Sequence, residues 1–314
     1  MVGGYTKGLH EIGDGLWAYL QPDGGWGWSN AGLVAGDRDG ESLLIDTLFD
    51  LRLTGEMLDA MRRVVPAASR IGTVVNTHAN GDHWFGNALV SDADIIASRA
   101  CAEEMAELPP STLATLVKAA PNLGEAGQFL MKIFEPFEFD GIEAAPATRT
   151  FEGELELSVA GKVVRLVEVG PAHTRGDVVA HVPEDGVVFT GDILFHGGHP
   201  IVWAGPVANW IAACDRILTL DRVSVVVPGH GPVTDRSAVA DLKGYFEYLT
   251  AQARMRFDAG MSPVDAAADI DLGPYLGWGE RERVVVNVCA LYRDFGAQVP
   301  SDVATLFGHM AQFA

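Results

Sequence analysis

Residues 76–87 read NTHANGDHWFGN and follow an apolar run of the length of a buried strand. Two histidines and an aspartate, His78, Asp82 and His83, lie within six residues here. A loop at the carboxyl end of a strand is a common place for functional side chains in an α/β protein. The stretch therefore predicts a metal site, in which Asn80 stands where a further histidine ligand would be expected.

Three more residues of metal-ligand type follow later apolar runs, each at or near a glycine. His173 follows VVRLVEV within GPAHTRGD, Asp192 ends VVFTGD, and His230 lies in SVVVPGHG. Because separate strand ends deliver these side chains, we expect them to meet the loop of residues 76–87 at one rim. Imidazole and carboxylate groups are ligands that zinc and related divalent ions accept.

Five motifs, in this order and spacing, resemble the metallo-β-lactamase superfamily. The resemblance covers roughly residues 12–240 and implies an α/β (α+β) protein built as a four-layer αββα sandwich. It also implies a hydrolytic site with one or two metal ions. The motifs are LLIDT (43–47), THANGDHWFGN (77–87) against the family's HxHxDH loop, AHTRGD (172–177), FTGD (189–192) and PGHG (228–231).

Carried over by position, the resemblance implies two neighbouring metal positions and one residue that supports them. Asp46 of LLIDT would orient a ligand histidine through a hydrogen bond. The metal ligands would be His78, Asn80 and His173 at the first position, Asp82, His83 and His230 at the second, and Asp192 as a bridge between them.

Asn80 leaves the first position open to three interpretations. An amide oxygen is a poorer zinc ligand than imidazole, although it can bind harder ions. The first position would therefore bind zinc weakly, bind Mn or Fe instead, or stay empty while the second still activates water. Zinc, one or two ions per chain, is the expected metal. We favour an altered or partly occupied site over one that binds no metal and has no activity.

Metal-activated water is the chemistry that such a site supports. Two metals about 3.5–4 Å apart can share a water and lower its pKa to about 7, which creates hydroxide at neutral pH. Asp82 could steer that water or relay a proton, which makes it the candidate catalytic residue. No GxSxG motif or Cys/His pair competes for the role.

We therefore expect a metal-dependent hydrolase that cleaves an ester-like acyl bond: a thioester, an ester or a lactone. A polyketide-type thioesterase/cyclase, a β-lactamase-like amidohydrolase and a non-hydrolytic iron oxidoreductase of the same fold remain alternatives. A metal-free binding protein is a further one. It predicts no bound metal and no effect of Asp192→Ala.

Aromatic and histidine side chains near the motifs suggest a substrate pocket. Together with an apolar helical insertion, they predict a bulky apolar or aromatic small-molecule substrate. The candidate pocket residues are Trp26, Trp28, Phe85, His196, His199 and Trp203.

The pattern of predicted strands and helices divides the chain into a main domain and a C-terminal extension. Residues 1–240 alternate strands and helices, with a helical insertion at about 99–137, and residues 241–314 are helical and expected to pack on the same domain. The apolar face of the extension would cover the core or pair with a second subunit, so a homodimer is one expected state.

The amino-acid composition excludes some classes of binding partner. The formal charge is −20 and the pI near 4.7, which disfavours nucleic-acid and membrane-surface partners. No apolar run is long enough to span a membrane, and the N-terminal residues have no apolar leader segment. Three widely spaced cysteines, Cys101, Cys214 and Cys289, fit reduced thiols. These features predict a cytoplasmic protein.

Overall fold

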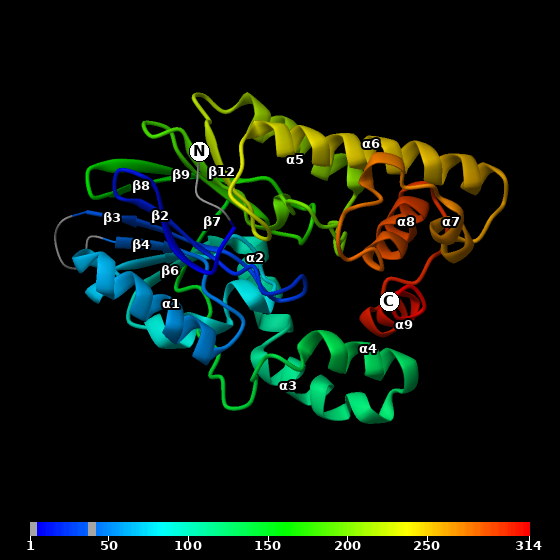
Figure 1. The fold of residues 1–314 in the computed structure, drawn as a ribbon, viewed down its shortest axis with the longest axis horizontal. Helices are drawn as coiled ribbons and strands as arrows, with labels where there is room; N and C mark the ends of the chain where they lie inside the picture. Colours follow the sequence, from blue (N-terminus) through cyan, green and yellow to red (C-terminus); the bar gives the residue numbers. More distant parts are fainter. Residues whose placement is uncertain (1–4, 37–41) are drawn as a thin grey trace.

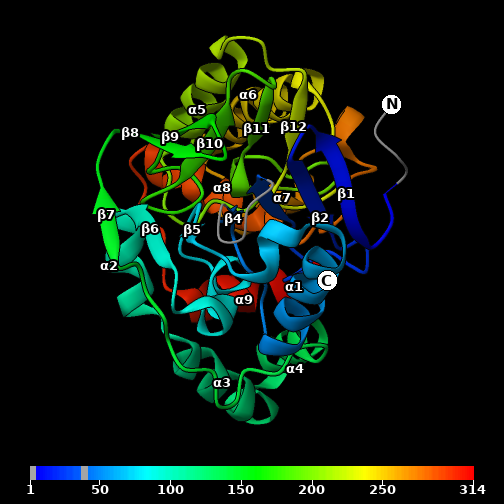
Figure 2. The same cartoon turned by 90° about the vertical axis from the view of Figure 1, so that its left-hand side faces the viewer.

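Two mixed β-sheets lie face to face at the centre of the protein, and helices cover the outer face of each (Figure 1). The structure is a computed structural model that describes residues 5–36 and 42–314. The N-terminal segment was predicted to have no apolar leader, and its first four residues lie outside the described ranges. Figure 2 shows the same layers from the side, with α1 below the first sheet and α5 and α6 above the second. The predicted αββα sandwich is confirmed.

The first sheet follows the chain order from β1 to β7. Its strands pair antiparallel as far as β4 and parallel from β4 onward. The strands are β1 (Gly8–Gly13), β2 (Leu16–Leu20), β3 (Ala31–Ala35), β4 (Ser42–Ile45), β5 (Thr73–Val75), β6 (Asp94–Ser98) and β7 (Arg149–Phe151).

The second sheet has the order β12-β11-β10-β9-β8. All of its pairs are antiparallel except β11 with β12, which run parallel. The strands are β8 (Glu154–Val159), β9 (Lys162–Glu168), β10 (Val178–Val182), β11 (Val187–Phe189) and β12 (Val225–Val227).

Alternate residues of the strands fill two separate layers of core. In β3, Val34 packs between the sheets, whereas Leu33 packs toward the helices outside, as the two-residue period of a strand requires. The sheets approach closely at Gly32, where a Cβ would collide with the ring of Phe189 in β11. Glycine is therefore required there for the two sheets to pack.

Helix α1 (Leu51–Val64) covers the first sheet. Its N-cap is Asp50, whose side chain accepts a hydrogen bond from the Leu53 amide. The helix ends before Pro66, because the residue before a proline avoids the helical conformation. Helix α5 (Val207–Thr219) covers the second sheet with the buried side chain of Trp210.

Three helices occupy the predicted insertion at 99–137: α2 (Arg99–Glu107), α3 (Pro110–Ala119) and α4 (Gly124–Phe134). The C-terminal part is helical as well, with α6 (Arg236–Asp258), α7 (Pro263–Asp269), α8 (Arg283–Asp294) and α9 (Val303–Ala311). The predicted boundary at 240/241 falls inside α6. Helix α9 packs on α4 through the rings of Phe307 and Phe129, 6.0 Å apart (Figure 1).

Short 3-10 turns complete the fold, and three of them, η2, η3 and η5, carry motif residues. Within the described ranges, no helix has both the length and the apolar character needed to cross a membrane. The turns are η1 (Pro66–Ser69), η2 (Gly81–His83), η3 (Phe85–Val90), η4 (Ala120–Asn122), η5 (Gly191–Ile193) and η6 (Gly273–Tyr275).

Candidate metal centre

The loop after β5 folds back on itself through η2 and thereby carries His78, Asp82 and His83 inward. Asn76 closes the base of this loop, because its Nδ2 donates to the carbonyl of His83 over 2.9 Å. A buried tryptophan, Trp84, donates its indole N–H to the carbonyl of Ala79 over 2.9 Å. The loop is thus held by buried hydrogen bonds at both ends.

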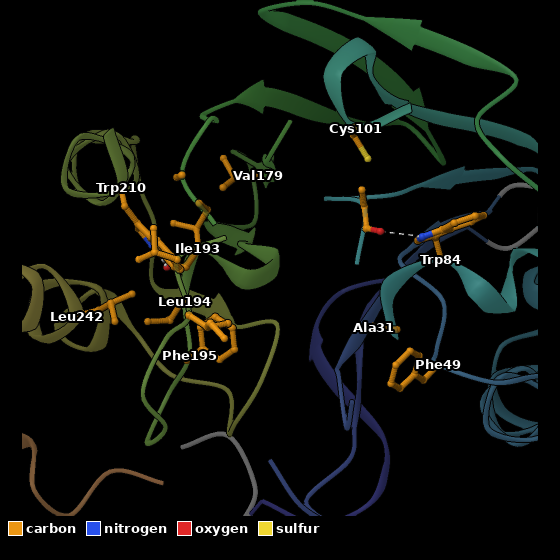
Figure 3. Packing of buried hydrophobic residues seen from close by; sticks show 14 of the residues in the cluster. Ala31, Phe49, Trp84, Cys101, Val179, Ile193, Leu194, Phe195, Trp210 and Leu242 are labelled. Carbon is orange, nitrogen blue, oxygen red and sulfur yellow. Dashed lines mark hydrogen bonds between the residues drawn. The ribbon is translucent and has the colours of Figure 1, made fainter. Parts of the chain in front are cut away.

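A second buried tryptophan holds the turn that carries Asp192. The indole N–H of Trp210 donates to the carbonyl of Ile193 over 3.0 Å. Figure 3 shows Trp210 with Ile193 and Leu242 on one side of the molecule and Trp84 with its hydrogen bond on the other. Both metal-site turns are therefore anchored directly in the hydrophobic core.

Asp192 lies at the centre of four histidines. Its Oδ2 is 3.7 Å from Nε2 of His78, 3.3 Å from Nε2 of His173 and 3.4 Å from Nε2 of His230. Its Oδ1 is 3.2 Å from Nε2 of His83. A carboxylate in this position can bridge two metal ions, which is the role that the resemblance implied for it.

Asp82 supplies a second carboxylate on the other side of His230. Its Oδ2 is 3.3 Å from Nε2 of His230 and 3.7 Å from Nε2 of His83. Two compact groups of donor atoms result in the described part of the chain: His78, His83 and Asp192 in one, and Asp82, His83 and His230 in the other.

Asn80 contacts His173 directly, and neither compact group includes His173. The amide Nδ2 of Asn80 lies 3.0 Å from Nε2 of His173, the nitrogen that would bind metal. Rotation of the amide about its last bond would present Oδ1 there instead. The side of the site that Asn80 occupies is therefore the less complete one.

The far nitrogen of each histidine has an oxygen partner, which leaves Nε2 free for a metal. The Nδ1 atoms of His78, His83, His173 and His230 contact Thr77 Oγ1 at 3.0 Å, Asp46 Oδ2 at 2.9 Å, the Ile201 carbonyl at 2.7 Å and the Trp28 carbonyl at 3.2 Å, respectively.

Asp46 has the position that the resemblance implied. Besides contacting His83, it accepts hydrogen bonds from the amide and the hydroxyl of Thr77, both over 2.7 Å. Its backbone has a φ of 62°, a left-handed conformation that costs energy in a residue other than glycine. The strained turn directs the carboxylate into the site behind His83.

Three buried atoms of the site have no hydrogen-bond partner among the described residues: Nε2 of His78, Nε2 of His83 and Oδ1 of Asp192. Leaving such an atom unpaired costs about 1–3 kcal/mol. A divalent cation would satisfy all three, and nitrogen and carboxylate donors are its usual ligands. The residues present therefore fit a divalent metal.

The pKa shifts divide the histidines of the centre into two groups. Burial lowers the pKa of His173 to about 4 and that of His78 well below its usual value, so both are in the neutral form that binds metal. Burial opposes charge on the second side too, but there Asp192 and Asp82 raise the pKa of His230 to about 9. Burial raises the pKa of Asp192, but His230, His83 and His78 outweigh it and hold that pKa well below the usual range.

A cavity of about 420 Å³ opens onto the centre. Asn80, Asp82, His173, Asp192 and His230 lie in its wall. Three of the predicted pocket residues line it as well: Trp26, Phe85 and Trp203.

The other three predicted pocket residues are not in the wall, which corrects the sequence interpretation. The ring of Trp28 packs against Phe137, 5.0 Å away. His196 turns aside, with its Nδ1 3.0 Å from the Pro232 carbonyl. His199 is buried beside the rings of Tyr245 and Trp278.

The sequence interpretation missed residues that the distant helices bring to the cavity. Glu104, Thr112 and Leu116 come from the insertion, and Arg283 and Phe307 from the C-terminal helices. Arg283 stands out because it is a buried cation. The only feature of the sequence that could have identified Arg283 is its position as a charged residue in an apolar helix. That pattern is also usual at a helix end exposed to solvent.

Comparisons with known proteins agree with the fold. The family model described as "Metallo-beta-lactamase superfamily" matches residues 24–230. A probable metallo-hydrolase of Bacillus subtilis is 32% identical over 100 residues, which cover 30% of this chain and 47% of that protein. The hydroxyacylglutathione hydrolase of Brucella ovis is 27% identical over 139 residues, or 42% of this chain and 54% of the relative. The chain thus spans about half the length of the curated relatives it matches.

Solved structures of the same fold cover most of the chain. A stereoselective inverting sec-alkylsulfatase from Pseudomonas sp. superposes with a TM-score of 0.67 at 18% identity, over 92% of this chain and 50% of that one. A metallo-beta-lactamase family protein from Thermus thermophilus superposes with a TM-score of 0.64 at 19% identity, over 90% of this chain and 94% of that one. At these identities the likeness shows the fold.

Proposed function

The chain belongs to the metallo-β-lactamase superfamily, and we propose that this metallo-hydrolase cleaves an ester-like acyl bond of a bulky apolar or aromatic substrate. The bond would be a thioester, an ester or a lactone. One observation carries the proposal: both carboxylates of the centre and two of its histidines lie in the same cavity wall as large apolar side chains. They are Asp82, Asp192, His173 and His230. A substrate held by that wall would have its reactive bond beside the metal ligands.

The residues of the centre suit a hydrolytic reaction. Zinc, as one or two ions per chain, would supply an activated water when bound, and Mn or Fe would serve in its place. Asp82 lies in the cavity wall and would orient that water or pass its proton to the leaving group. Asp192 and the histidines would hold the metal charge in place while negative charge develops on the acyl oxygen.

The cavity wall favours a large apolar group over a small polar one. The large apolar side chains that line the cavity are Trp26 and Phe85 near the metal-binding loops, Leu113 and Leu116 from α3, and Phe307 from α9. Burying apolar area yields about 25 cal/mol per Å², so a bulky acyl or aromatic group gains the most from this surface.

The choice of acyl bond rests on the relatives of this chain. A curated relative is named as a hydrolase of hydroxyacylglutathione, and it matches 42% of this chain. An alkyl sulfate ester is a second candidate, because the superposition on the sec-alkylsulfatase covers 92% of the chain. A thioesterase/cyclase, a β-lactam amidohydrolase and an iron oxidoreductase are further alternatives.

A substrate panel on protein of known metal content tests the proposal. The panel contains a phenylacetyl thioester, a phenylacetate ester, an aryl lactone, a cephalosporin and a secondary alkyl sulfate. We expect metal-dependent hydrolysis of at least one acyl ester and its loss in Asp192→Ala. Cleavage of the sulfate or the cephalosporin alone would overturn the acyl assignment. Activity that persists in Asp192→Ala would overturn the metal centre, and bound iron with a visible absorption band would favour redox chemistry.

A further inference from the structure

Arg283 is a buried cation in the wall of the substrate cavity, without a carboxylate partner among the described residues. Its side chain is 2% exposed, and no described carboxylate lies within ion-pair distance of it. In the same part of the chain, the one hydrogen bond of its guanidinium runs from Nη1 to the carbonyl of His199 over 3.1 Å. Its buried Nε has no partner there. A buried charge in this condition is costly unless an anion neutralises it.

The second arginine of the cavity wall shows the contrast. Arg175 is paired with two glutamates, with Nη2 2.8 Å from Glu107 and Nε 3.7 Å from Glu104. The carboxylate next to Arg283 in sequence, Glu282, accepts the indole N–H of Trp26 over 2.7 Å instead. Of the two arginines in this wall, Arg283 is thus the one without a carboxylate partner among the described residues.

Two aromatic rings fix the guanidinium in place. It lies 4.3 Å from the ring centre of Trp26 and 5.2 Å from that of Phe195. Such contacts stabilise a cation, yet they leave the in-plane N–H groups available for a planar anion. The group is therefore rigid and oriented before a ligand arrives.

Phe195 also connects Arg283 with the metal centre. Its ring stacks on His230 with ring centres 5.1 Å apart and planes 4° apart. The two distances place the guanidinium at most about 10 Å from the imidazole of His230. A small organic anion spans that distance with a few bonds.

We propose that Arg283 binds an anionic group of the substrate, a carboxylate or an oxyanion of sulfur, while the reactive bond lies at the metal centre. This inference rests on the proposed function for the position of the reactive bond. It assigns the substrate class more narrowly: an apolar molecule with one negative charge, which would be bound at most about 10 Å from the imidazole of His230. Because the chain carries a net charge of −20, Arg283 supplies the local attraction that the overall charge does not.

Binding of a matched pair of probes tests Arg283 without turnover. The probes are 3-phenylpropane-1-sulfonate and the neutral methyl 3-phenylpropyl sulfone, and affinity is measured by calorimetry on metal-loaded and metal-depleted protein. A sulfonate and a sulfone both coordinate divalent metals weakly, so a preference for the sulfonate reports on the arginine. We expect the wild type to bind the sulfonate at least about tenfold more tightly, as charge-assisted hydrogen bonds require.

Two variants complete the test. Arg283→Met should abolish the preference, whereas Arg281→Met, which removes the same charge from an exposed position beside it, should keep it. Equal affinity of the wild type for both probes would overturn the proposal, and so would a preference that survives in Arg283→Met.

A spectroscopic measurement covers the case in which Arg283→Met does not fold. Arg283→Lys retains the buried charge and identifies the Nε–H resonance of Arg283 by its loss. That resonance should shift when the sulfonate is added to the wild type, and an unchanged resonance would contradict the proposal. A sulfonate preference without any hydrolase activity would disprove the proposed function alone, and hydrolysis without the preference would disprove the role of Arg283 alone.

Discussion

The side-chain amide of Asn80 lies 3.0 Å from Nε2 of His173, so it contacts the nitrogen through which that histidine would bind metal. Neither compact donor group of the described chain includes His173: one is His78, His83 and Asp192, and the other is Asp82, His83 and His230. The centre is therefore asymmetric, because Asn80 supplies an amide where a third imidazole would complete the position of His78 and His173.

Asn80→His should convert the asymmetric centre into a symmetric one. Imidazole binds zinc far better than an amide oxygen, so we expect the variant to hold two metals tightly where the wild type holds one tightly and one weakly. Metal analysis of the purified proteins after dialysis measures this. Asn80→Ala is the control, since it removes the contact with His173 and adds no ligand; its metal content should stay at or below that of the wild type. About two tightly bound metals in the wild type would contradict the expectation.

Asp46→Asn should weaken metal binding although Asp46 is not a ligand. The carboxylate lies 2.9 Å from Nδ1 of His83 and orients that ring, and loss of such a supporting contact costs about 10–100-fold in metal affinity. Competition with a fluorescent chelator measures the affinity. Asp59→Asn removes an exposed carboxylate from α1 and should change nothing. An unaltered affinity in Asp46→Asn would show that His83 is held by its other contacts.

The side chains that follow strands were predictable from the sequence. Asp46 follows β4, His78 follows β5, Asp192 follows β11 and His230 follows β12, and each run is apolar enough to identify as a strand. Glycines near His78, Asp192 and His230 marked the turns, so local patterns sufficed to place the centre at one edge of the sandwich.

Residues placed by tertiary packing were not predictable in this way. Arg283 and Phe307 reach the cavity because α9 packs on both α4 of the insertion and α8, and no local spacing records those contacts. His199 follows Asp192 closely in sequence, yet the bridge between Gly198 and Gly279 turns the chain and carries its side chain toward Tyr245. Sequence proximity to a motif was misleading there.

Trp26 and Trp28 should differ in their effect on catalysis. Trp26 lines the cavity, whereas the ring of Trp28 packs on Phe137 outside it. We expect Trp26→Ala to raise KM for an apolar substrate about tenfold or more, since it removes contact area worth about 1–3 kcal/mol. Trp28→Ala should lower the melting temperature and leave KM close to that of the wild type. Steady-state kinetics and thermal melting separate the two, and equal changes in KM would refute the assignment.

Gly32→Ala should destabilise the protein by about 1–3 kcal/mol, because the added methyl group must displace the buried ring of Phe189 between the sheets. The matched control is Gly55→Ala in α1, where the nearest atom to a new Cβ is on Leu89 at 3.9 Å. That change should stabilise the helix by about 0.5–1 kcal/mol. Urea unfolding measures both. A neutral Gly32→Ala would mean that the sheets can separate without cost.

His199 should make stability depend on pH. Burial, together with the nearby charges of Arg283 and Arg281, lowers its pKa from the usual 6.5 to about 4. Between these two pH values His199 binds a proton in the unfolded chain but not in the folded chain. Its contribution to the free energy of unfolding is therefore fully present above about pH 6.5 and is lost as the pH falls toward 4. The loss approaches about 3 kcal/mol, at about 1.36 kcal/mol per pKa unit.

His199→Phe should remove this part of the pH dependence, because phenylalanine fills the space beside Tyr245 and Trp278 without a titrating group. The measurement is the free energy of unfolding in urea at about pH 7 and about pH 4.5, for the wild type and the variant. The difference between the two proteins isolates His199 from the other groups that titrate in this range. If both proteins lose the same stability between these pH values, the imidazole is not held neutral by burial.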